Sequence, residues 1–195
     1  MQALPATPDV DQHVYVHMSW AGFEQFLTLR GDSPGPRVTY LDGVLELRSP
    51  SETHEGIKSR LGRLLELWAA HEGIELAAFG STTLKQARSK AGIEPDECYV
   101  VGRNAMQGRP DLAIEVTVSS GGLDKLAAYH RLAVPEVWFW EDARLRIFVW
   151  RKAGYARRAR SVVLPTLDLR FFTPFVADPN QLRAVRNLMA ALRRN

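Results

Sequence analysis

The chain has 195 residues, of which 46% are hydrophobic and 24% are charged. This balance is typical of a globular protein that buries a core without disulfides or metal. The single cysteine, Cys98, excludes an internal disulfide and a zinc site built from cysteines. No apolar run approaches the roughly 18 residues of a membrane span, and the first residues do not resemble a secretion leader. We therefore expect a soluble, cytoplasmic protein with no membrane partner.

The formal net charge is +3, and arginine dominates the 25 basic residues. Arginines gather between residues 151 and 160 and again between residues 183 and 194. Such clusters suit a phosphate backbone. A solvated helix face together with an arginine-rich codon bias explains the same pattern more simply. The charge is therefore compatible with nucleic acid but does not establish it.

The first elements follow from local signals. Residues 1–17 are expected to form an N-terminal tail, and residues 18–195 a single domain that ends in a helix. Ser19 is a suitable cap for a short helix with apolar residues on one side, and Gly31 is a suitable end for it.

Residues 37–48, RVTYLDGVLELR, predict two strands joined by a tight turn at Asp42-Gly43. Apolar residues then recur at helical spacing from about residue 53 to residue 72, and Gly73 ends this helix.

The second half of the chain predicts mainly strands. Several strands are expected between residues 74 and 101. Residues 111–118, DLAIEVTV, are almost continuously apolar, which favours a strand covered on both faces. A helix over about 123–132 and two strands within 134–151 follow, and Pro179 precedes the final helix. This order predicts an α/β protein, a mixed sheet flanked by helices.

Two acidic residues stand where a purely structural protein would not place them. Glu115 lies in the middle of an apolar strand, and a buried, unpaired carboxylate costs several kcal/mol. Asp96 follows Pro95 at the start of another strand. If the two strands are neighbours, the acids can converge on one Mg²⁺ ion, which prefers oxygen ligands. The alternatives are that Asp96 is a turn residue and that Glu115 forms a structural ion pair with an arginine.

A lysine follows these acids at a suitable distance along the chain. Lys125 comes ten residues after Glu115, in the first turn of the next expected helix. From there its ammonium could orient an attacking water or neutralise charge on a phosphate. An ordinary surface lysine paired with an acid is the competing interpretation.

Six segments occur in an order that resembles a known family: VLELRSPSETHE, GSTT, EPDECY, DLAIEV, LDKLAAY and VPEVW. Together they are similar to the Uma family of restriction-endonuclease-like proteins, within the PD-(D/E)XK nuclease superfamily. The match runs from about residue 37 to residue 150. It implies a restriction-endonuclease-like mixed β-sheet flanked by helices.

The resemblance also implies a metal site. It assigns Asp96 and Glu115 as ligands of Mg²⁺, or of Mn²⁺ in its place, with the carbonyl of Val116 as a third ligand. Thr117 stands where the E-x-K pattern would place lysine, and in this family that role moves to Lys125.

Four further residues belong to the matched segments or depart from them. Glu46 and His54 lie in the hairpin and the long helix, and the resemblance implies that both assist at the metal site and face the same cavity as Asp96. A solvent-facing position at the helix start is the alternative for His54. Arg48 stands where relatives usually carry methionine. Tyr129 is interpreted as a core residue.

The expected function is therefore a Mg²⁺-dependent endonuclease that hydrolyses DNA with a metal-activated water. Asp96 and Glu115 hold the ion, Lys125 supports the nucleophile, and Glu46 and His54 assist. One alternative is an inactive nuclease-fold protein that binds nucleic acid or a protein partner, and another is a hydrolase of a different phosphoester. Nucleases of this fold often pair to cut two strands, so a homodimer is compatible with the resemblance.

Overall fold

The computed structural model describes residues 9–33, 35–118 and 122–194. Its strands are β1 Gln12–His17, β2 Arg37–Leu41, β3 Val44–Ser49, β4 Leu76–Ala78, β5 Leu84–Gln86, β6 Ala91–Ile93, β7 Glu97–Val101, β8 Leu112–Val116, β9 Glu136–Glu141, β10 Arg144–Val149 and β11 Ala156–Arg158. Its α-helices are α1 Trp20–Arg30, α2 Glu52–His71, α3 Lys125–Arg131, α4 Leu169–Ala177 and α5 Gln181–Leu192, and the short 3₁₀-helix η1 spans Ala87–Ser89.

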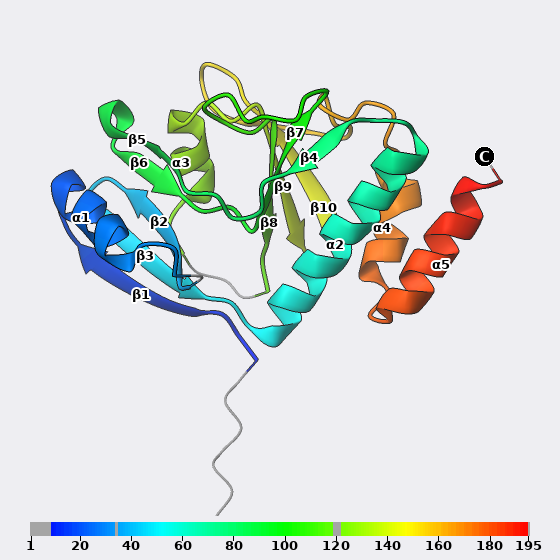
Figure 1. Ribbon diagram of the computed structural model, residues 1–195, viewed down its shortest axis with the longest axis horizontal. Helices are drawn as coiled ribbons and strands as arrows, with labels where there is room; N and C mark the ends of the chain where they lie inside the picture. The colour runs from blue at the N-terminus through cyan, green and yellow to red at the C-terminus, as the bar shows by residue number, and fades with distance from the viewer. Residues whose placement is uncertain (1–8, 34, 119–121, 195) are drawn as a thin grey trace, which may run out of the picture.

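Within the described residues, the strands form two sheets (Figure 1). One has the order β1-β3-β2-β6-β5, and its described pairs are antiparallel. The other has the order β11-β10-β9-β8-β7-β4 and is mixed, because β8 and β9 are parallel. A parallel pair needs a crossover connection, and α3 lies in it. The chain enters the second sheet at β4, returns to the first sheet with β5 and β6, and passes to the second sheet again between β6 and β7.

The central strand β8 divides the core because its side chains alternate between the two faces of the sheet. Leu112, Ile114 and Val116 pack in the cluster that includes residues of α2, α4 and α5. Ala113 points to the opposite face, into a second cluster with residues of α3 and the first sheet. Figure 1 shows α2, α4 and α5 gathered on one side of the second sheet and the first sheet on the other. Glu115 shares the face of Ala113 and therefore faces α3.

Two helix starts near this face are fixed by side-chain caps. The hydroxyl of Ser51 accepts a hydrogen bond from the backbone N–H of His54 at the start of α2. The carboxylate of Asp124 accepts one from the N–H of Ala127 at the start of α3. Such caps satisfy N–H groups that have no partner within the helix. They set where the first turns of α2 and α3 begin.

The predicted α/β class with a mixed sheet and flanking helices is confirmed, although the strands form two sheets where one was expected. The Ser19 cap, the turn at Asp42-Gly43 and the long helix are where local signals placed them. Of the predicted tail, residues 1–17, residues 12–17 form the edge strand β1 instead, and residues 1–8 lie outside the described part of the chain. None of the helices in the described ranges is both long and apolar enough to cross a membrane.

Candidate active site

A cluster of charged side chains lies where the two sheets meet. Asp96 stands in the link from β6 to β7, and Glu115 lies on the neighbouring strand β8. Arg48 reaches them from β3 of the other sheet. Asp96 and Glu115 are 1% and 0% exposed, and Arg48 is 4% exposed. Three elements far apart in the sequence thus bury two carboxylates and one guanidinium together.

The two carboxylates converge on a single atom. Nη2 of Arg48 lies 2.5 Å from Oδ1 of Asp96 and 3.6 Å from Oε2 of Glu115. Both acids therefore point to the same face of the second sheet. A shared metal requires this arrangement, because carboxylates on opposite faces of the sheet could not reach one ion.

Residues of α3 hold both oxygens of Glu115. Lys125 donates from Nζ to Oε2 at 2.5 Å, and Tyr129 donates from its hydroxyl to Oε1 at 2.5 Å. Lys125 and Tyr129 are four residues apart, so they lie on one face of the helix. Burial raises the pKa of Glu115 above its ordinary value, although Lys125 and Arg48 act in the opposite direction. Burial also raises the pKa of Tyr129, which therefore stays a neutral donor.

Asp96 is held by a different set of donors. Its Oδ2 accepts the backbone N–H of Val116 at 2.8 Å and lies 3.0 Å from Nε2 of His54. Burial alone would raise the pKa of Asp96, but the hydrogen bond from His54 and the charge of Arg48 outweigh it and lower that pKa. The other ring nitrogen of His54, Nδ1, lies 2.9 Å from Oδ2 of Asp11. His54 therefore bridges Asp96 to a second acid.

Glu46 lies beside this cluster. Its Oε1 lies 2.5 Å from Nδ1 of His13, and its Oε2 accepts the backbone N–H of Leu123 at 2.8 Å. A Cβ at Gly122 would lie 3.0 Å from Oε1 of Glu46, which fits the absence of a side chain at that position. The described contacts of Glu46 thus fix the residues before α3, the helix that carries Lys125.

A cavity of about 250 Å³ opens above the cluster. Its lining includes Asp11, His13, Arg48, Val116 and Lys125. The described lining does not include Asp96, Glu115, His54 or Glu46, so the expectation that Glu46 and His54 open onto the cavity does not hold in this structure. Arg48 and Lys125 separate the buried acids from the cavity.

The donor set fits a hard divalent cation. Asp96 and Glu115 supply carboxylate oxygens directed to one point, and Val116 contacts Asp96 through its backbone N–H and lines the cavity. Mg²⁺ takes one or two carboxylates and keeps several waters, for which the cavity leaves room. In the described part of the chain, His, Cys, Asp and Glu side chains form no metal-binding group of three or more. The fit is therefore to a water-rich site with two side-chain ligands.

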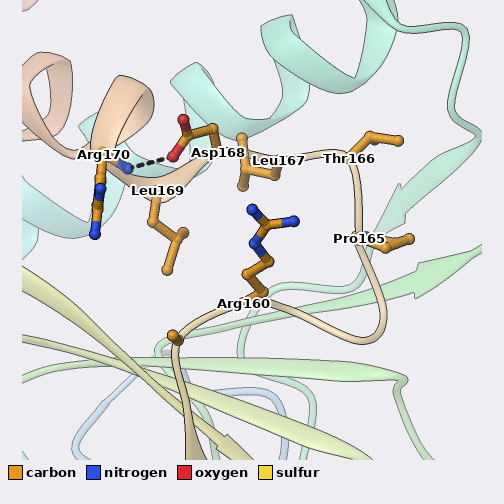
Figure 2. A pocket seen from close by; sticks show the side chains of 8 residues that line it. Arg160, Pro165, Thr166, Leu167, Asp168, Leu169 and Arg170 are labelled. Carbon is orange, nitrogen blue, oxygen red and sulfur yellow. Dashed lines mark hydrogen bonds between the residues drawn. The ribbon is translucent and has the colours of Figure 1, made fainter.

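A second pocket of about 300 Å³ lies elsewhere, between the loop after β11 and the start of α4 (Figure 2). Arg160 and Arg170 line it, and Asp168 accepts the backbone N–H of Arg170 at 2.8 Å as the cap of α4. This pocket shares no lining residue with the cavity above the acids. The chemistry that points to catalysis therefore belongs to the cavity between the two sheets.

Fold and site together define a nuclease-like α/β protein, and comparison with known proteins gives the family. The chain belongs to the Uma2 family, described as "Putative restriction endonuclease", whose model matches residues 23–175. It is also similar in fold to the crystal structure of "a putative nuclease belonging to DUF820" from Anabaena variabilis ATCC 29413, with 14% identity and a TM-score of 0.50. That match covers 69% of this chain and 82% of the other. No curated protein matches the chain.

These findings confirm the resemblance and the fold class. The structure brings together Asp96, Glu115, Val116, Lys125 and His54, and it sets Glu46 beside them. Their catalytic and metal-binding roles remain predictions.

Sequence reasoning missed other members of the cluster. Asp11 fell in the predicted tail. Tyr129 lies in the core as expected, and its additional contact with Glu115 had a usable signal in its spacing of four from Lys125 on a helix. Arg48 was noticed as a departure from the family, and its position between the acids was not foreseen.

Proposed function

We propose that the protein is a Mg²⁺-dependent endonuclease that hydrolyses DNA phosphodiester bonds by attack of water. The observation that carries this proposal is the convergence of Asp96 and Glu115, from neighbouring strands, on one buried point beside a cavity. Membership in a nuclease-like family supports the reaction class. The choice of Mg²⁺ and of DNA belongs to the proposal.

Each residue of the cluster has a task in this reaction. Asp96, Glu115 and the carbonyl of Val116 would hold the ion, which supplies Lewis acidity and lowers the pKa of a bound water. Lys125, next to Glu115 and lining the cavity, orients the attacking water or stabilises charge on the phosphate. His54 orients the carboxylate of Asp96 through Oδ2, and Glu46 holds the residues before Lys125 in place.

The test is a nicking assay on supercoiled plasmid with Mg²⁺, with Mn²⁺ and with EDTA. We expect metal-dependent nicking by the parental protein and a loss of at least about 10²-fold in Glu115→Gln, the size expected for a disabled catalytic group. Glu141→Gln is the matched control, because Glu141 lies on the next strand, β9, and pairs with Arg146 at the surface. If the parental protein leaves plasmid intact with both metals, the proposed activity is refuted.

A second candidate function has an observation in its favour. Arg48 pairs with both acids and neutralises charge that a metal would otherwise balance. A nuclease-fold protein that binds nucleic acid without cutting would tolerate this arrangement. Gel-shift binding in EDTA that weakens steeply with salt, together with intact plasmid in Mg²⁺, would favour this candidate.

A further inference from the structure

We propose that Arg48 is a built-in competitor of the divalent cation, so that a metal ion binds only when the guanidinium leaves the carboxylate pair. The inference rests on the proposed function, because it concerns the same metal site. It adds a regulatory property that the fold and the family do not imply.

The position of Arg48 is the first observation. Its Nη2 is the atom on which Asp96 and Glu115 converge, at 2.5 Å and 3.6 Å. A guanidinium stays protonated in proteins, so this point carries a permanent positive charge. An ion that used the same two oxygens would have to occupy the space that Nη2 fills.

The charge balance of the cluster is the second observation. Asp96, Glu115 and Asp11 bring three negative charges, and Arg48 and Lys125 bring two positive ones. A divalent ion added to these five side chains would turn an excess of one negative charge into an excess of one positive charge, and it would stand directly beside the guanidinium of Arg48 in a buried region, which is unfavourable. Withdrawal of a resident cation therefore favours metal binding. Lys125 contacts one acid, whereas Arg48 contacts both and stands at their meeting point.

A second anionic partner is available to Arg48. Its Nη1 already lies 3.5 Å from Oδ2 of Asp11. Asp11 and Arg48 both line the cavity of about 250 Å³. The guanidinium can thus turn away from Asp96 and Glu115 toward Asp11 and the cavity without losing every anionic partner. An arginine without such a neighbour would be held in place more firmly.

The test measures metal binding without DNA or turnover. Arg48→Met removes the charge and keeps a long side chain. Arg48→Gln is a second neutral variant, for use if Arg48→Met folds poorly, because its amide can still donate a hydrogen bond to Asp96. Arg37→Met is the matched control, because Arg37 pairs with Arg48 across β2 and β3 and contacts Ser81 instead of the acids. Calorimetric titration with MgCl₂ and MnCl₂ gives the affinity, and melting curves with and without metal give an independent readout.

We expect both neutral variants at position 48 to bind metal at least about tenfold more tightly than the parental protein, since removing one nearby positive charge favours the ion. Their melting temperatures should also rise more on adding metal. Arg37→Met should behave like the parental protein. Equal or weaker metal affinity in the Arg48 variants overturns the competition and leaves the metal site standing. If no variant binds either metal, the proposed Mg²⁺ dependence fails, and the inference fails with it.

Discussion

Two buried carboxylates on neighbouring strands have opposite surroundings. Glu115 on β8 and Glu136 on β9 are each 0% exposed. Glu136 accepts hydrogen bonds from the indole of Trp138 and the hydroxyl of Ser161, both at 2.5 Å, and from the backbone N–H of Val162 at 2.7 Å. Glu115 is held by Lys125, by the hydroxyl of Tyr129 and by the charge of Arg48.

The difference separates a structural acid from a candidate catalytic one. The donors to Glu136 are neutral and belong to the backbone or to side chains with few rotamers, so they offer a fixed, complete set of partners. Two of the partners of Glu115 are long cationic side chains that also line a cavity. Such partners can rearrange when a ligand arrives, whereas those of Glu136 cannot do so without unfolding the loop around Ser161.

The largest expected effect contrasts the same substitution at the two sites. Glu136→Gln places an amide N–H₂ against fixed donors, so the free energy of unfolding should fall by about 3 kcal/mol. Glu115→Gln should change it by less than about 1 kcal/mol or raise it, because burial disfavours the ionised carboxylate and Lys125 can move into the cavity. Urea denaturation at pH 7 in EDTA measures both. A larger loss in Glu115→Gln would reverse the assignment of the two acids.

The next prediction concerns Lys125, one of the two cationic partners that distinguish Glu115 from Glu136. Lys125→Ala should leave the fold intact without weakening metal binding and should reduce the nicking rate by about 10²-fold, the effect of losing one positioned electrostatic group. Lys85→Ala is the matched control, because Lys85 is 43% exposed and pairs with Glu24 outside the cluster. Nicking by Lys125→Ala at the parental rate would remove this lysine from the mechanism.

Local signals explain which parts of the fold could be predicted. A Ser cap, an Asp-Gly turn and a helical repeat of apolar residues each act within a few residues, so α1, the β2–β3 turn and α2 followed from sequence. The pairing of β1 with β3 and the division into two sheets depend on contacts between distant segments. No local pattern predicted helix α4, which carries Pro174 within it.

The residues of the candidate site also fall into those that could be predicted from the sequence and those that could not. Glu115 could be identified because an acid in an apolar strand conflicts with its surroundings, and the family resemblance selected Asp96 and Lys125. Asp11 lies 43 positions from its partner His54, and no local pattern connects them. The contact of Arg48 with Asp96 spans 48 positions and depends on how the two sheets meet. The partners that distinguish Glu115 from Glu136, two cationic side chains that line a cavity instead of a set of neutral donors, are a property of the assembled fold.

The smallest expected effect concerns a third carboxylate that is paired with a cation at the surface. Asp178, at the end of α4, accepts two hydrogen bonds from Arg183, which is 59% exposed. These bonds and the backbone N–H of Asn180 lower the pKa of Asp178 from 3.8 to about 2. For an acid with a lowered pKa, the stabilisation is complete above the ordinary value and is lost as the pH falls through the folded value. The parental protein should therefore be slightly more stable than Asp178→Asn at pH 6, and this difference should shrink as the pH falls toward 2 and vanish below it.

Melting temperatures of both proteins across this range, at low and high salt, measure the effect, and salt should reduce it because the pair is accessible to solvent. A difference that persists well below pH 2 would mean that the charge of Asp178 is not what stabilises this helix end. Asp178 also shows that a cationic partner alone does not identify a catalytic acid. Ordinary surface acids have cationic partners too, because both charges remain hydrated and the desolvation cost of pairing is small. It marks a candidate catalytic acid when the pair is buried, borders a cavity and includes a second carboxylate directed to the same point, as at Glu115 and Asp96.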